Sequence, residues 1–101
     1  MRAGWQLMDK EKLLAANEIQ NRLLHLPGWS SDGRSITKFF NFTTYMEGVA
    51  FANRVADAAE ESNHHPDMVL GYKMVVVTLT THSAKGITQK DIDLATELQG
   101  Y

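Results

Sequence analysis

The sequence contains no cysteine. This absence excludes disulfide scaffolds, thiolate zinc sites and cysteine nucleophiles. No apolar run approaches the roughly 20 residues that a membrane-spanning helix needs, and residues 1–8 are too short and too polar for a signal or transit peptide. Since neither secretion nor a membrane is favoured, we expect a cytoplasmic protein, with the nucleus as the alternative compartment.

Positive and negative residues are nearly balanced. Ten Lys and Arg residues face twelve Asp and Glu residues, which gives a net charge of −2 and argues against a nucleic-acid partner, since such proteins carry a basic patch. Only two prolines occur, and no linker or repeat divides the 101 residues. We therefore expect one domain over 1–101, with 1–8 as a loose N-terminal extension, and a site at its surface or at a subunit boundary.

The first half of the chain shows a helix and a hairpin. Asp9 is a suitable N-cap, apolar residues then recur at helical spacing as far as Leu24, and Pro27-Gly28 ends the helix. Asp32-Gly33 is a tight-turn signal, and the following residues alternate between apolar and polar, so a β-hairpin is expected there.

The second half predicts a long helix, two strands and a terminal helix. Thr44 with Glu47 forms a capping box, and a face of mostly small residues follows it. The β-branched run 74–81 is the strongest strand signal, paired through a bend near 71–72, and both of its faces are apolar at the start. This predicts cover on both sides, by helices or by another subunit. Thr88 and Asp91 form a second capping box.

The resulting order, α-β-β-α-β-β-α, predicts an α+β fold in which a four-stranded antiparallel sheet is covered by helices. Three of the four histidines, His64, His65 and His82, fall at the ends of its elements, where a rigid scaffold can aim side chains. Each of them also has a plain structural explanation as a surface or helix-end residue. For the isolated His25 we accept that explanation.

Metal-free acid/base catalysis is the chemistry that these histidines favour. A metal site ranks below it, because adjacent His64 and His65 seldom reach one ion and Pro66 interrupts the helix that would align Glu60 with His64. Nucleophilic catalysis ranks lower still, since no oxyanion or elbow motif surrounds Ser83. An imidazole, with an ordinary pKa of about 6.5, is available in both protonation states near neutral pH.

A carboxylate beside one imidazole would favour its protonated form and fix its tautomer. Asp91 closes the loop that follows His82, and it is the candidate for that role. Two imidazoles on opposite sides of a flat substrate would then give and take protons in one dehydration.

Seven positions at fixed spacings carry a resemblance to a known family: Glu60, His64, His65, Pro66, Tyr72, His82 and Asp91. The similarity extends to Gly28-Trp29, Phe40-Asn41-Phe42, Arg54-Val55-Ala56 and Leu79-Thr80-Thr81, and so covers nearly the whole chain from the first helix onward. This pattern resembles the pterin-4a-carbinolamine dehydratase family.

The resemblance implies a dehydratase that converts 4a-hydroxytetrahydropterin, such as 4a-hydroxytetrahydrobiopterin, into quinonoid dihydropterin and water during tetrahydrobiopterin recycling. It implies that the pterin is a substrate and that no cofactor or metal is needed. By position, His64 and His82 match the principal acid/base residues and His65 matches a third active-site histidine. The remaining matches shape the pocket or support the histidines: Glu60, Pro66, Tyr72, Thr81 and Asp91.

Met68 departs from the family pattern, because animal members carry a tryptophan there that helps to hold the pterin ring. A thioether makes a polarizable ring contact but positions it less firmly than an indole. The resemblance also implies homodimers or homotetramers. The alternative function is a protein-binding module, such as a dimerisation cofactor for a transcription factor or an assembly chaperone, although such a module has no physical need for three histidines.

Overall fold

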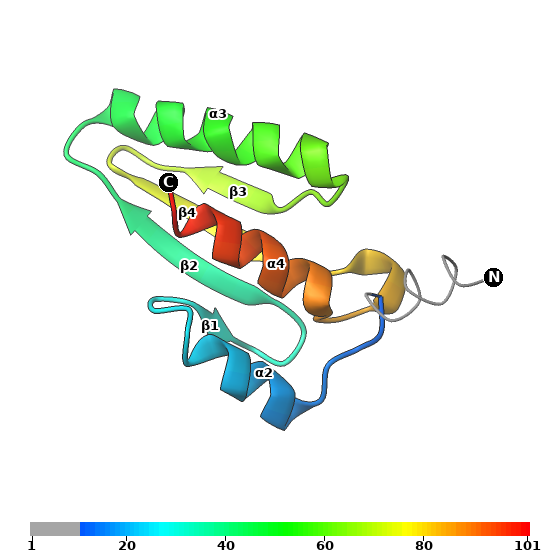
Figure 1. Ribbon diagram of the computed structural model, residues 1–101. Helices are drawn as coiled ribbons and strands as arrows, with labels where there is room; N and C mark the ends of the chain where they lie inside the picture. The colour runs from blue at the N-terminus through cyan, green and yellow to red at the C-terminus, as the bar shows by residue number, and fades with distance from the viewer. Residues whose placement is uncertain (1–10) are drawn as a thin grey trace.

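The computed structural model describes residues 11–101, so the predicted cap Asp9 and the predicted loose segment 1–8 lie outside the described residues. It contains four strands in one antiparallel sheet, in the order β1-β2-β4-β3 (Figure 1). The strands are β1 (Ser30–Ser31), β2 (Ile36–Asn41), β3 (Asp67–Leu70) and β4 (Met74–Leu79). The helices are α2 (Ala16–Leu23), α3 (Tyr45–Ser62) and α4 (Gln89–Leu98), with a 3-10 turn, η1, at His82–Ala84. The α+β prediction and the order of its elements are confirmed.

The first helix is shorter than the sequence predicts. It begins at Ala16, and the Glu18 carboxylate accepts a hydrogen bond from the Ala15 amide at 2.8 Å. The residues before it are extended instead, because the Leu14 amide bonds to the Ile87 carbonyl at 2.9 Å and Leu13 forms an isolated bridge with Thr88. Pairing with this loop thus replaces the predicted first turns of the helix.

Helices α3 and α4 lie on one face of the sheet, and α2 packs at the β1 end (Figure 1). Along β4, Val75, Val77 and Leu79 face these helices and are buried, while Met74 and Val76 on the other face are half-buried. Cover by helices on both faces, one of the two predicted alternatives, is therefore not found in the single chain. Among residues 11–101, no helix is long and apolar enough to cross a membrane.

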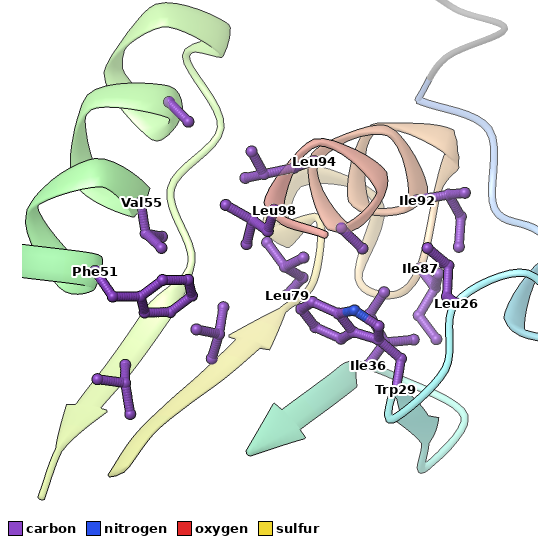
Figure 2. Packing of buried hydrophobic residues seen from close by; sticks show 14 of the residues in the cluster. Leu26, Trp29, Ile36, Phe51, Val55, Leu79, Ile87, Ile92, Leu94 and Leu98 are labelled. Carbon is purple, nitrogen blue, oxygen red and sulfur yellow. The ribbon is translucent and has the colours of Figure 1, made fainter. Parts of the chain in front are cut away.

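The core is a single apolar layer between helices and sheet. Figure 2 shows Phe51 and Val55 of α3 and Leu98 of α4 directed into this layer, which the sheet closes with Leu79. The small residues predicted on α3 allow close approach: Gly48, Ala58 and Ala59 are buried there. This packing fixes the ends of α3, β4 and α4, which are the elements that carry the histidines and Asp91.

Candidate active site

His64 and His65 are placed by the end of α3. Asn63 adopts a left-handed conformation, with φ 52°, its amide bonds to the Glu60 carbonyl, and the His64 amide bonds to the Ala59 carbonyl at 3.0 Å. This pair of bonds is a Schellman motif, which ends a helix sharply and turns the chain. The motif, followed by half-buried Pro66, directs His64 inward and leaves His65 exposed.

Asp91 is placed by the start of α4. Thr88 is the N-cap, and Asp91 in the third helical position accepts a hydrogen bond from the Thr88 amide at 2.9 Å, as the predicted capping box requires. The side chain of Asp91 is completely buried. A buried carboxylate needs several donors to compensate for lost hydration.

Asp91 finds those donors in His64 and Thr81. Its Oδ1 lies 2.6 Å from Nε2 of His64, and its Oδ2 accepts a hydrogen bond from the Thr81 hydroxyl at 2.8 Å. Because Thr81 donates to Asp91, its oxygen accepts from the Thr88 hydroxyl at 2.7 Å, which in turn accepts from the Lys90 amide at 3.2 Å. The hydroxyl hydrogens of Thr81 and Thr88 therefore each have a defined acceptor.

This network determines which nitrogen of His64 carries hydrogen. An ionised carboxylate only accepts hydrogen bonds, so Nε2 of His64 must be the donor. The neutral imidazole then has no hydrogen on Nδ1, and this nitrogen is able to take up a proton and later release it. His64 is buried but lines a hollow of about 360 Å³ between the end of α3 and the length of α4, together with Ser62, Leu94 and Glu97.

His65 has a different partner. Its Nε2 makes a short contact with the Glu60 carboxylate one turn back on α3, and both side chains are exposed. Glu60, which the resemblance places among the pocket residues, thus contacts the second histidine of the pair. An exposed pair of this kind orients a ring without contributing much stability, since water screens the charges.

His82 lies apart from the carboxylate that the sequence assigns to it. It begins η1 and is exposed, and it lines a hollow of about 450 Å³ with Asp67, Thr78 and Thr80. The prediction that Asp91 supports His82 is wrong, since both oxygens of Asp91 bond elsewhere. The reason is geometric: Thr81 points inward to Asp91, and the next residue leaves the core.

Met68 and Tyr72, two other predicted site residues, lie in different surroundings. Met68, half-buried on β3, is opposite Val77 of β4 in the register and packs against the core on the helix-covered side. Tyr72 lies in the β3–β4 turn, at the opposite end of the strands from the histidines, where it stacks on Tyr45 with ring centroids 6.5 Å apart. Within one chain, Tyr72 is therefore not brought to the histidines.

Sequence reasoning missed the side-chain role of Thr88 and the cations beside His82. Thr88 is predicted only as a cap, although a threonine just after a strand end and another at a helix cap, seven residues apart, are a usable signal for a shared bond. Arg34 and Lys85, which line the same hollow as His82, carry no spacing signal at all. Within residues 11–101, no three potential ligands are grouped closely enough to hold a metal ion.

Comparison with known proteins agrees with the resemblance seen in the sequence. The sequence profile of the family described as pterin 4 alpha carbinolamine dehydratase matches residues 4–101. The chain belongs to this family. Two relatives carry the name "Putative pterin-4-alpha-carbinolamine dehydratase": one from Natronomonas pharaonis is 51% identical over 81% of this chain and 87% of the relative, and one from Thermosynechococcus vestitus is 45% identical over 81% and 86%.

Two solved structures share the fold of this pterin-4a-carbinolamine dehydratase family member. A protein of Brucella melitensis described as a transcriptional coactivator/pterin dehydratase is 36% identical, with a TM-score of 0.83 over 88% of this chain and 97% of that one. A pterin dehydratase-like protein described as a RuBisCO assembly factor in the alpha-carboxysome is 22% identical, with a TM-score of 0.59 over 71% and 83%. The second likeness concerns the fold alone.

Proposed function

We propose that this protein is a 4a-hydroxytetrahydropterin dehydratase that works by metal-free histidine acid/base catalysis, without a cofactor, and serves tetrahydrobiopterin recycling. In the reaction the bond between C4a and its hydroxyl oxygen breaks, and the hydroxyl leaves as water after gaining a proton. The proton on N5 is lost and a double bond forms between C4a and N5. One proton is given and one is taken, so two positioned groups suffice.

The observation that carries the proposal is the buried His64–Asp91 pair. At 2.6 Å from a fully buried carboxylate, the His64 ring is held in one tautomer and one orientation. The Asp91 carboxylate occupies the Nε2 side of the ring, so Nδ1 is the nitrogen left to exchange a proton with a substrate. A buried, oriented imidazole of this kind suits a proton-transfer step far better than it suits a surface contact.

His82 is the second proton-transfer group in this proposal, and the Glu60–His65 pair assists it or the substrate. Pro66 and Met68 contribute to holding the pterin, and Thr81 supports His64 through Asp91. Except for Met68, which departs from the family pattern, these assignments follow the motif positions of the family together with the placements described above. Neither histidine is assigned as acid or base.

The test is the rate of 4a-hydroxytetrahydropterin dehydration above the spontaneous background. We expect the wild-type protein to accelerate it, and His64→Ala and His82→Ala each to lower turnover by about 10² to 10⁴-fold. His65→Ala is expected to do less. His25→Ala is the matched control, since His25 lies at the end of the first helical segment and is exposed. Wild-type rates in both of the first two variants would refute the assignment.

A protein-binding module is the second candidate, and exposed apolar side chains favour it. Tyr45, Met46, Leu70 and Tyr72 are between 42% and 73% exposed near the start of α3 and the β3–β4 turn. The description of the Brucella melitensis protein includes a coactivator role, which belongs to that protein. If a folded wild-type protein does not exceed the spontaneous rate, this second function takes precedence.

A further inference from the structure

The hollow beside His82 carries an unusual charge for a protein whose net charge is −2. Arg34 and Lys85 line it together with His82, against a single carboxylate, Asp67. Within the part of the chain that the structure describes, neither Arg34 nor Lys85 forms an ion pair. Hydroxyl groups of Thr78 and Thr80 complete the lining. Two cations that form no ion pair with another described residue make this surface suited to an oxyanion.

The backbone at Arg34 is fixed on both sides. One carboxylate oxygen of Asp32 accepts hydrogen bonds from the amides of Arg34 and Ser35 at 2.9 and 2.8 Å. The Thr80 hydroxyl donates to the Arg34 carbonyl at 2.6 Å, which ties this turn to the chain just after β4. The guanidinium therefore extends from a rigid base toward the hollow that His82 lines.

The backbone at Lys85 is in a strained conformation that favours glycine or asparagine. Its φ is 61°, and it closes η1 through a bond from its amide to the His82 carbonyl at 3.1 Å. Left-handed conformations are uncommon for residues with long side chains, and such strain tends to occur at functional sites. Lys85 is exposed, so core packing does not account for lysine at this position.

We propose that Arg34 and Lys85 form an oxyanion subsite that selects pterins whose side chain carries a carboxylate or a phosphate. The inference rests on the proposed function, since it places the pterin ring next to His82. A guanidinium binds either group in a bidentate manner, and an ammonium adds a point charge. Lys85 and Arg34 are specificity residues in this scheme, and the proton transfers remain with the histidines.

The test is a fluorescence titration of the protein with three oxidised pterins, which need no catalysis. They are pterin-6-carboxylic acid, a pterin with a phosphorylated side chain, and neutral 6-hydroxymethylpterin. We expect both anionic pterins to bind at least about 10-fold more tightly than the neutral one, as expected for hydrogen bonds to a charged group. The ratio of the two anionic affinities identifies the preferred oxyanion.

Three variants make the test specific. Arg34→Gln and Lys85→Asn are each expected to weaken anionic binding about 10-fold and to leave neutral binding unchanged. Asparagine tolerates a positive φ, so Lys85→Asn is expected to keep or raise the Tm. Lys73→Gln removes the same charge at the far turn between β3 and β4 and should change neither affinity. Inorganic phosphate should compete with the anionic pterins only.

The outcomes separate the subsite from the proposed function. Equal affinity for anionic and neutral pterins, or unchanged anionic binding in both variants, overturns the subsite even when the dehydration assay is positive. Selective anionic binding that both variants lose establishes the subsite. If the same protein then fails to accelerate dehydration, the proposed catalysis is overturned and the subsite stands.

Discussion

Asp91 combines two tasks at the residue scale, since the same side chain caps α4 and holds the His64 ring. Its Oδ2 serves the cap and its Oδ1 serves the imidazole. The sequence predicts the first task from the spacing of Thr88 and Asp91. The second depends on where the end of α3 meets the start of α4, which only the folded chain determines.

Asp91→Asn separates charge from shape. In the native protein the Thr88 amide and Nε2–H of His64 donate to different oxygens of Asp91. An asparagine side chain has only one accepting oxygen, and its amide group donates, so it cannot accept both of these hydrogen bonds. We expect the fold to persist with lower stability, and dehydration to fall by about 10²-fold or more because the His64 tautomer changes. The pH–rate profile should also move, and an unchanged profile and rate would contradict the role given to this pair.

The carboxyl group of Asp32 predicts that the stability of the fold depends on pH. Hydrogen bonds from the Arg34 amide, then from the Ser35 amide, hold the pKa of its carboxyl below the ordinary 3.8. Because the folded-state pKa is depressed, the carboxylate stabilises the fold above pH 3.8, and this contribution is lost as the pH falls through the lowered value. Urea unfolding should therefore show Asp32→Ala less stable than wild type at pH 7, with a difference that shrinks below pH 3.8. A difference in stability that does not change with pH would contradict this contribution of the Asp32 carboxylate.

At the scale of elements, Gly48 in the first part of α3 costs stability without a steric need. A Cβ there would lie 3.5 Å from Phe42 and Val75 side-chain atoms, which is ordinary contact. Alanine is the better helix former, so Gly48→Ala should raise the free energy of unfolding by roughly 0.5 to 1 kcal/mol. Ala50→Gly, at an exposed position of the same helix, should lower it by a similar amount. A loss of stability in Gly48→Ala would mean that α3 must approach β4 more closely.

Sequence signals predict an element well where the residues that begin or end it are neighbours in the sequence. The capping boxes at Thr44 and Thr88 and the turn at Asp32-Gly33 all appear in the structure. The predicted first helix is too long at its start, because Leu13 and Leu14 pair with the distant segment 87–88, a contact that no local pattern reveals. For the same reason the predicted pairing of Asp91 with His82 is wrong, because the contact of Asp91 with His64 depends on where α3 meets α4.

For the whole molecule, the uncovered face of the sheet and the edge strand β3 predict self-association. Val69 on this edge is 64% exposed, and exposed apolar edges tend to pair with another chain. We expect dimers or tetramers by sedimentation, and Val69→Lys should shift them toward monomer while circular dichroism stays unchanged. Val69→Thr, without a charge, should stay associated. A wild-type protein that is monomeric at all concentrations would exclude the oligomer.

The contrast between His64 and His82 bears on how such a protein would change over evolutionary time. Loss of His64 would leave a buried carboxylate short of a donor, so selection for folding alone would retain it. His82 is exposed and, within residues 11–101, its side chain makes no hydrogen bond, so folding does not demand it. A lineage that abandoned the chemistry would therefore lose His82 first. Its presence or loss among relatives would therefore indicate whether the chemistry was kept.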